Sequence, residues 1–204
     1  MANNTYLLHN NSEKAIVVDP SWDAEYILRE SARYKPIGLI LLTHGHFDHS
    51  LYAAQVKEKT GAELWIHELD ASYLDRNVSK AKSEFGINYP HVSADRTFTD
   101  GEIIKWGEDE INVIHTPGHT LGGVCFLTGK ILITGDTLFE GSVGRWDFSD
   151  GDGAALFQSI KEKILALDDD VIIYPGHGGQ STVGNERKYN PYLKMSPEEL
   201  EMLD

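Results

Sequence analysis

Short apolar runs alternate with amphipathic stretches along the first half of the chain. Tyr6–Leu8 and Ala15–Val18 are apolar runs separated by polar turn residues, which predicts a pair of strands. Residues 23–34 place apolar side chains on one face and stop before Pro36, which predicts a helix. Residues 37–42 (IGLILL) form a short apolar run between turn signals, so we expect a buried strand there.

The alternation continues to residue 66 and then gives way to a polar stretch. Residues 50–60 predict a helix stopped by Gly61, and residues 63–66 predict another strand. Residues 68–75 predict a short helix. Residues 76–96 are polar and irregular, with glycine and proline, and predict either a flap over a site or a surface loop.

Closely spaced short strands dominate the pattern from residue 101 onward. Apolar runs separated by turns predict an antiparallel meander, with strands at residues 102–106, 111–115, 123–127 and 130–134. A helix at 153–167 and a strand at 171–174 follow, and residues 196–199 have the capping signals of a final helix. The whole pattern predicts an α/β fold of two sheets packed face to face with helices outside, one sheet from each half.

Composition adds a strong acidic excess to an otherwise ordinary globular chain. Its 204 residues, 41% hydrophobic and 25% charged, predict a single domain. The net charge of −14 repels phosphate backbones and anionic lipids, so we expect no nucleic-acid partner and no membrane partner. Carboxylates that bind a cation would account for part of this charge.

The single cysteine and the first residues bear on the cellular compartment. Cys125 excludes a disulfide framework and lies in an apolar stretch, so we expect a buried core residue in a reducing environment. The start of the chain, MANNTYLLHN, lacks the basic and apolar regions of a secretory signal. No window approaches the roughly 18 apolar residues of a membrane span. These observations predict a soluble, cytoplasmic protein.

The densest group of candidate metal ligands is the motif THGHFDH, which supplies His44, His46, Asp48 and His49 directly after a predicted strand. Three further candidates also follow predicted strands and lie beside glycine, which lets the backbone turn sharply: His119 in TPGHT, Asp136 in ITGDTLF and His177 in YPGHGG. Because side chains at the ends of strands can converge on one rim, we expect these residues to form a single metal centre.

Five histidines and two aspartates are too many ligands for one four-coordinate ion. Two ions about 3.5–4 Å apart that share a bridging carboxylate would use them all. Histidine and aspartate without a thiolate suit zinc, iron or manganese.

The sequence gives weaker indications of a role at the metal centre for the remaining histidines and for Asp19. His9, His67 and His91 are expected on the surface or in loops, and His115 is expected to pack in the fold or to support a ligand. Asp19, in VVDPS, is expected either to orient a ligating imidazole or to serve as a turn residue.

Together these motifs resemble the metallo-β-lactamase superfamily: HxHxDH, then a distant GH, then GD, then GH, over nearly the whole chain. The resemblance implies an αββα sandwich of two mixed β-sheets with helices on the outer faces, in one domain over residues 1–204. It also implies two sets of metal ligands. One ion would be bound by His44, His46 and His119, the second by Asp48, His49 and His177, with Asp136 as the bridge.

Two segments narrow the resemblance to short bacterial hydrolases similar to glyoxalase II (hydroxyacylglutathione hydrolase). Residues 135–148 resemble the segment that carries the bridging aspartate and a substrate-binding basic residue, here Arg145; a structural ion pair is the alternative role for this arginine. Residues 175–193 resemble the tail of those enzymes. Full-length glyoxalase II adds a helical domain that grips glutathione. Only 27 residues (204 − 177) follow His177, so we expect a short C-terminal extension and no separate helical substrate domain.

The resemblance implies hydrolysis of a small-molecule thioester of the S-lactoylglutathione type by a hydroxide activated on two divalent ions, zinc before iron or manganese. Asp48 would orient the nucleophile and Asp136 would bridge the ions, so these are the predicted catalytic carboxylates. Arg145 would bind a carboxylate of the substrate. We expect a monomer or a homodimer.

Other functions of the same superfamily stay open. A glutathione persulfide dioxygenase would hold one iron with His44, His119 and Asp136, a facial triad with open coordination positions. A lactonase or another ester hydrolase would need only a different pocket. The common dinuclear β-lactamases usually carry cysteine at the position of Asp136, and the acidic charge disfavours a nuclease.

Overall fold

The N-terminal half of the chain forms a five-stranded sheet. The computed structural model describes residues 3–12 and 14–195, so the final helix predicted from residues 196–199 lies outside the described part. The predicted pair of β1 (Tyr6–Leu8) and β2 (Ala15–Val18) is confirmed as antiparallel. Parallel pairing then adds, in order, β3 (Ile37–Leu41), β4 (Glu63–His67) and the unpredicted β5 (Arg96–Phe98).

The C-terminal half forms a six-stranded sheet in the order β13-β12-β9-β8-β7-β6. The predicted meander is confirmed, because β6 to β9 pair antiparallel in succession. β12 pairs parallel with β9, and β13 antiparallel with β12. The bounds are β6 (Ile103–Trp106), β7 (Asp109–His115), β8 (Val124–Thr128), β9 (Ile131–Gly135), β12 (Ile172–Pro175) and β13 (Ser181–Thr182). A separate unpredicted hairpin joins β10 (Leu138–Phe139) to β11 (Ser142–Val143).

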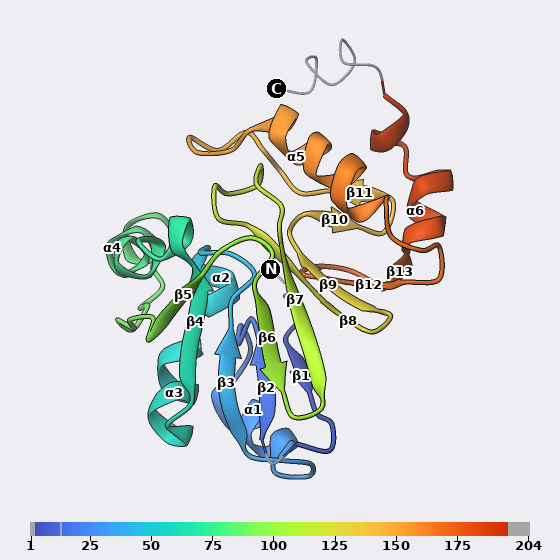
Figure 1. Ribbon diagram of the computed structural model, residues 1–204. Coiled ribbons are helices and arrows are strands. Elements are labelled where there is room, and N and C mark those ends of the chain that lie inside the picture. The colour runs from blue at the N-terminus through green and yellow to red at the C-terminus, as the bar shows by residue number, and fades with distance from the viewer. Residues whose placement is uncertain (1–2, 13, 196–204) are drawn as a thin grey trace.

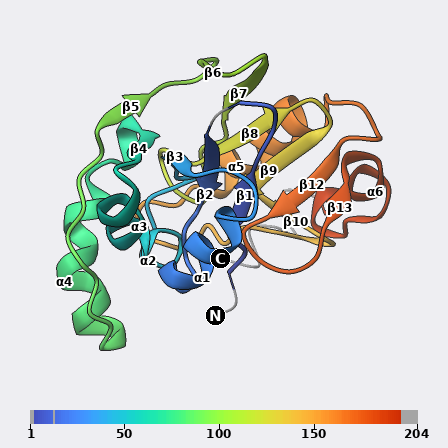
Figure 2. The same cartoon turned by 90° about the horizontal axis from the view of Figure 1, so that it is seen from below.

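Helices cover the outer face of each sheet (Figures 1 and 2). In Figure 1 the first sheet lies at the lower left with α1, α3 and α4. The second sheet runs from β6 and β7 in the lower centre to β12 and β13 on the right, with α5 and α6 at the upper right. The helices are α1 (Ala24–Ser31), α2 (Phe47–Ser50), α3 (Ala53–Thr60), α4 (Tyr73–Phe85), α5 (Gly153–Ser159) with its π-helical continuation η2 (Ile160–Ile164), and α6 (Val183–Tyr189). Two 3-10 turns are η1 (Glu68–Asp70) and η3 (Tyr192–Lys194). Among the described residues, no helix is long and apolar enough to cross a membrane.

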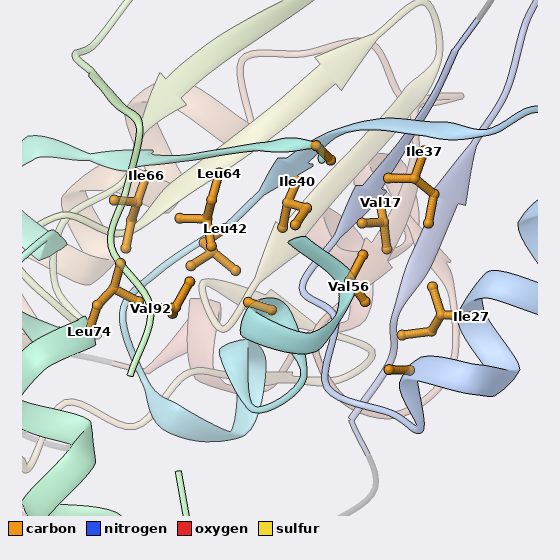
Figure 3. Close-up of a cluster of buried hydrophobic side chains, with 13 residues drawn as sticks. Val17, Ile27, Ile37, Ile40, Leu42, Val56, Leu64, Ile66, Leu74 and Val92 are labelled. Atoms are coloured by element: carbon orange, nitrogen blue, oxygen red, sulfur yellow. The ribbon is translucent and has the colours of Figure 1, made fainter. Parts of the chain in front are cut away.

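Three apolar layers confirm the predicted αββα sandwich. In the first layer, Ile40 and Leu64 from the first sheet face Ile27 of α1 and Val56 of α3 (Figure 3). The middle layer joins the two sheets and contains Ile16, Leu41, Phe126 and Ile133. The outer layer of the second sheet contains Leu132, Ile173, Leu156 and Ile160. Cys125 is buried in that layer as predicted, and burial raises the pKa of its thiol to about 11.

The polar stretch predicted to be irregular is helical over much of its length. α4 continues to Phe85, whereas the sequence predicted a helix only to residue 75. Its buried positions are Tyr73, Leu74, Asn77 and Ala81, so an asparagine interrupts the apolar face and conceals the helical periodicity. Gly86 ends the helix with a φ of 68°, a left-handed cap rather than a sign of irregular chain.

Candidate metal centre

All seven predicted ligands lie together at one end of the sandwich. His44 follows β3, and Asp48 and His49 lie in α2, which begins inside the THGHFDH motif rather than after it. The second sheet contributes residues that follow β7, β9 and β12, namely His119, Asp136 and His177. Because β7, β9 and β12 run in the same direction, their carboxyl ends meet at one edge of that sheet.

The ligand atoms form three overlapping clusters, each with all its atoms within 4.8 Å of one another. The clusters are His44 with His46 and His119, His44 with His49 and Asp136, and Asp48 with His49 and His177. The Asp136 carboxylate lies between them: Oδ1 is 3.3 Å from His49 Nε2, and Oδ2 is 3.5 Å from His119 Nε2 and 3.4 Å from His177 Nε2. A carboxylate in this place fits a bridge between two metal ions.

The hydrogen bonding of these side chains supports the same fit. His44 Nε2, His49 Nε2 and Asp136 Oδ1 are buried and have no hydrogen-bond partner. His49 Nε2 and Asp136 Oδ1 are close enough for a charge contact, but they do not have the geometry of a hydrogen bond. Buried polar atoms without partners cost about 1–3 kcal/mol each, and bound metal ions would satisfy them. The residues present therefore fit a pair of bound ions.

A chain of hydrogen bonds orients the buried imidazoles from behind. Asp19 Oδ2 accepts from His49 Nδ1 at 2.9 Å and from the Thr43 hydroxyl at 2.6 Å, while Asp19 Oδ1 accepts from the Thr43 backbone N–H. The Thr43 oxygen in turn accepts from His44 Nδ1 at 3.1 Å. Each Nδ1 is thereby occupied, which leaves Nε2 free to face a metal. Of the two roles expected for Asp19, orientation of a ligating imidazole is the one that the structure supports.

Burial keeps three of the imidazoles neutral. It lowers the pKa of His44 well below its usual value and that of His46 to about 3, and it also lowers the pKa of His119. His119 Nδ1 donates to the backbone carbonyl of Arg145 at 2.7 Å, which fixes its orientation. Neutral imidazole is the form that binds metals, so these side chains are ready as ligands at neutral pH.

His49 and Asp136 hold opposite charges at the middle of the site. Burial alone would lower the pKa of His49, but contact with Asp136 and Asp19 raises it well above its usual value. Burial would raise the pKa of Asp136, but contact with His49 holds it well below the usual range. A bound cation would take the place of the proton on His49, so metal binding would release a proton.

Asp70 is a supporting residue that sequence reasoning missed. Its fully buried carboxylate accepts hydrogen bonds from the backbone N–H of Gly45 at 2.8 Å, the Thr120 hydroxyl at 2.8 Å and the backbone N–H of Gly122 at 2.7 Å. Gly45 lies between two candidate ligands, and Thr120 follows another. Asp70 therefore ties the histidine loop of the first sheet to that of the second. The sequence feature that could have indicated Asp70 is its position just after β4, at the end of a strand, where the candidate ligands also lie.

Arg145 lies beside the centre but is already paired. Its side chain is 68% exposed, and its guanidinium donates to both carboxylate oxygens of Asp147, at 2.9 and 2.7 Å. It also lies over the ring of Phe148, 4.7 Å from the ring centre. Phe148 in turn contacts the rings of His46 and His119, with centres 5.2 and 5.5 Å apart. The ion pair expected as an alternative role is therefore present, on a loop that contacts the site.

One expectation for the remaining histidines is wrong. His67 is only 3% exposed, rather than on the surface, because it ends β4 beneath the second sheet. Its ring stacks on His115, with centres 4.3 Å apart and planes 11° from parallel. His9 and His91 are exposed, as predicted. His115 has a packing role through this stack.

The fold and the centre together define a class: an αββα protein with a histidine and aspartate site that fits two metal ions. The sequence profile of the metallo-beta-lactamase superfamily matches residues 1–177, and the chain belongs to this superfamily as a metallo-hydrolase. It is 36% identical to hydroxyacylglutathione hydrolase GloC of Haemophilus influenzae, over 93% of this chain and 92% of that protein.

Two solved structures are similar over nearly their whole length. The B3 metallo-beta-lactamase BLEG-1 superposes with a TM-score of 0.88 at 33% identity, over 95% of each chain. TTHA1623 in a di-iron-bound form superposes with a TM-score of 0.84 at 33% identity, over 94% of this chain and 95% of that one.

Proposed function

We propose that this protein hydrolyses thioesters of the S-lactoylglutathione type at a dinuclear metal centre. The observation that carries the proposal is the position of the Asp136 carboxylate. It contacts His119 of one ligand cluster and His177 of another. The relationship to a hydroxyacylglutathione hydrolase supports the thioester as the substrate class. The proposed ligand sets are His44, His46 and His119 for one ion, Asp48, His49 and His177 for the other, and Asp136 between them.

The bound ions would supply a hydroxide nucleophile at neutral pH and a Lewis acid for the carbonyl oxygen of the thioester. Zinc is the ion expected, and the di-iron form of a relative makes iron the first alternative to test. The side chain of Asp48 is 22% exposed, so its carboxylate faces the solvent side of the centre. There it can accept a hydrogen bond from the attacking water and orient it. Water adds to the carbonyl carbon and the carbon–sulfur bond breaks, which yields a carboxylic acid and a thiol. The thiolate is a good leaving group, so the reaction does not require a strong general acid.

Arg145 is proposed to bind a carboxylate of the substrate. Its exposed guanidinium lies on the loop whose backbone orients His119, so a substrate held there would extend toward the ions. A planar guanidinium suits a carboxylate in two-point contact, and the substrate would compete with Asp147 for it. Such an exposed ion pair contributes only about 0–1 kcal/mol, so its exchange costs little.

The test combines metal analysis of the purified protein with assays on three substrates: S-D-lactoylglutathione, a glutathione persulfide with oxygen-uptake detection, and a chromogenic β-lactam. We expect two metal ions per chain and hydrolysis of the thioester. One iron per chain with oxygen uptake and no hydrolysis would support the persulfide dioxygenase instead. Preferred turnover of the β-lactam, a substrate suggested by the likeness to BLEG-1, would also contradict the thioester proposal.

Two aspartate variants provide the matched comparison. Asp136→Ala removes the proposed bridge and should abolish hydrolysis. Asp170→Ala removes an exposed carboxylate that pairs with Lys130 at the surface and should leave hydrolysis unchanged. Full activity in Asp136→Ala would rule out the bridged centre.

A further inference from the structure

The first described residues of the chain join the two sheets beside the metal centre. Tyr6 belongs to the first sheet, yet its hydroxyl donates to the carbonyl of Pro175, the last residue of β12, at 2.5 Å. The Asn4 backbone N–H donates to the carbonyl of Gly176 at 2.7 Å. The Asn4 side-chain amide donates to the carbonyls of Pro175 at 3.0 Å and Gly178 at 2.9 Å. This segment therefore holds the backbone on both sides of His177.

Asn3 extends the same contacts to a second ligand. Its side-chain amide donates to the backbone carbonyl of Asp48 at 3.0 Å and to Asp48 Oδ2 at 3.2 Å. Its backbone forms an isolated antiparallel bridge with His177. Asp48 Oδ2 itself lies 3.8 Å from His177 Nε2. One residue thus contacts two candidate ligands that belong to different halves of the chain.

Both of these candidate ligands are partly exposed to solvent. The side chains of Asp48 and His177 are 22% and 28% exposed, whereas His44 and His119 are buried. A side chain open to solvent keeps more rotamer freedom than a buried one, and fixing it as a ligand costs that conformational entropy. A hydrogen bond that holds Asp48 in place before the metal arrives lowers this cost, as do the contacts behind other ligating side chains.

We propose that Asn3 is a positioning residue for the second metal ion, acting through Asp48 and the backbone beside His177. The inference rests on the proposed assignment of Asp48, His49 and His177 to one ion. Asn3 touches none of the ligands assigned to the first ion, whose loops are tied by Asp70 instead. Loss of the Asn3 amide should therefore weaken binding of the second ion and leave the first unchanged.

The test is zinc titration of the metal-depleted full chain against a chelating indicator, with no thioester present. Asn3→Ala is compared with Asn10→Ala. Asn10 also donates to a backbone carbonyl, that of Trp106 at 3.0 Å, and to a carboxylate oxygen, Asp109 Oδ2 at 2.7 Å, but far from the centre. Asn3→Ser, which keeps a hydroxyl donor, serves as a milder variant. Thermal melting of each metal-free protein establishes that it folds.

We expect Asn3→Ala to bind its first zinc with the wild-type Kd and its second about tenfold more weakly, as for other residues that orient ligands. Asn3→Ser should fall between Asn3→Ala and wild type, and Asn10→Ala should match wild type at both steps. Unchanged affinity for the second zinc in Asn3→Ala would overturn the proposal. Equal weakening of both steps would overturn it as well, since it would indicate a general structural role. A single zinc step in the wild type would refute the two-ion assignment and this inference together, whatever the substrate proves to be.

Discussion

Two glycines in the loop after β12 show how single residues set the space at the metal centre. A Cβ on Gly176 would lie 2.3 Å from Asp136 Oδ1 and 2.6 Å from His49 Cε1. A Cβ on Gly179 would meet only the flexible end of Glu140, at 3.0 Å. Neither glycine has a positive φ, so the difference between them is steric.

Gly176→Ala should therefore displace the Asp136 carboxylate or the His49 imidazole, while Gly179→Ala should be tolerated. A displacement of about 1 Å in a catalytic group costs on the order of a hundredfold in rate, so we expect a loss of that size in kcat/KM for Gly176→Ala. Metal content should fall in parallel. Equal activity in the two variants would mean that the loop moves aside and that the close approach is not needed.

His67, outside the metal centre, should make the stability of the protein depend on pH. Burial, and then the neighbouring His115, lowers the pKa of His67 from 6.5 to about 4. Between these values the unfolded chain takes up a proton that the folded protein excludes. Keeping His67 neutral therefore costs no free energy of unfolding above pH 6.5. The cost grows as the pH falls toward 4, and at pH 5 it lowers the free energy of unfolding by about 2 kcal/mol.

Urea unfolding at pH 7 and pH 5 tests this contribution. His67→Phe keeps a ring that can stack on His115 but cannot take up a proton. The variant should lose about 2 kcal/mol less than wild type between the two pH values. Identical pH dependence of the two proteins would show that His67 is protonated in the folded state at pH 5.

Among single residues, the sequence predicted the candidate ligands that the structure brings together, but not all of the residues that hold them. The seven ligand candidates are recognisable because histidine and aspartate recur beside glycine at strand ends. The side chain of Asn3 forms hydrogen bonds with Asp48, 45 positions away. Asp70 accepts hydrogen bonds from residues 25 to 52 positions away. Such partners follow from the packed fold and leave no local pattern. The burial of His67 was not predicted for the same reason, because it results from contact with the second sheet.

At the scale of elements, helix α4 and the loop at residues 144–152 contact both the metal centre and each other. The Tyr73 hydroxyl of α4 donates to Asp150 in the loop, and the Tyr73 ring lies 5.4 Å from that of His46. Arg76, one turn further along α4, lies over the Tyr73 ring and 3.9 Å from Asp150. Most strands, including the meander, were predictable from short-range periodicity, whereas the short strands β5, β10, β11 and β13 were not. The length of α4 was not, because its buried face uses an asparagine that donates to the Gly45 carbonyl.

The ion pair of Arg145 and Asp147 in this loop leads to a prediction about substrate binding. Arg145→Ala should raise KM for an anionic thioester about tenfold or more, because a charge-assisted hydrogen bond contributes about 1.5–3 kcal/mol. Asp147→Ala should lower KM, since it frees the guanidinium from its present partner. In both variants kcat should stay within a factor of about two, because uniform binding affects KM alone.

A thioester without a carboxylate provides the control for both variants. Its KM should be the same in wild type, Arg145→Ala and Asp147→Ala. If Arg145→Ala changes kcat for both substrates and leaves KM unchanged, the arginine acts by orienting His119 through the loop backbone and does not bind the substrate.

At the scale of the whole molecule, the metal centre lies where the two halves of the chain meet. Four candidate ligands come from the first sheet and its α2 turn: His44, His46, Asp48 and His49. The other three follow strands of the second sheet. Bound ions would therefore cross-link the two halves, in addition to the apolar layer between the sheets. That layer contains no ligand, so it holds the halves together whether or not a metal is bound.

Removal of the metal should therefore lower the melting temperature without unfolding the protein. A ligand that binds the folded state at about a thousand times its Kd adds about 4 kcal/mol. For a chain of this size that corresponds to a shift of about 10 °C in Tm. Calorimetry of chelator-treated and zinc-reloaded protein measures the shift. We expect one transition in both, because the inter-sheet layer couples the halves directly. Two separate transitions after chelation would show that the ions, and not the apolar layer, join the halves, and an unchanged Tm would show that the centre binds no metal tightly.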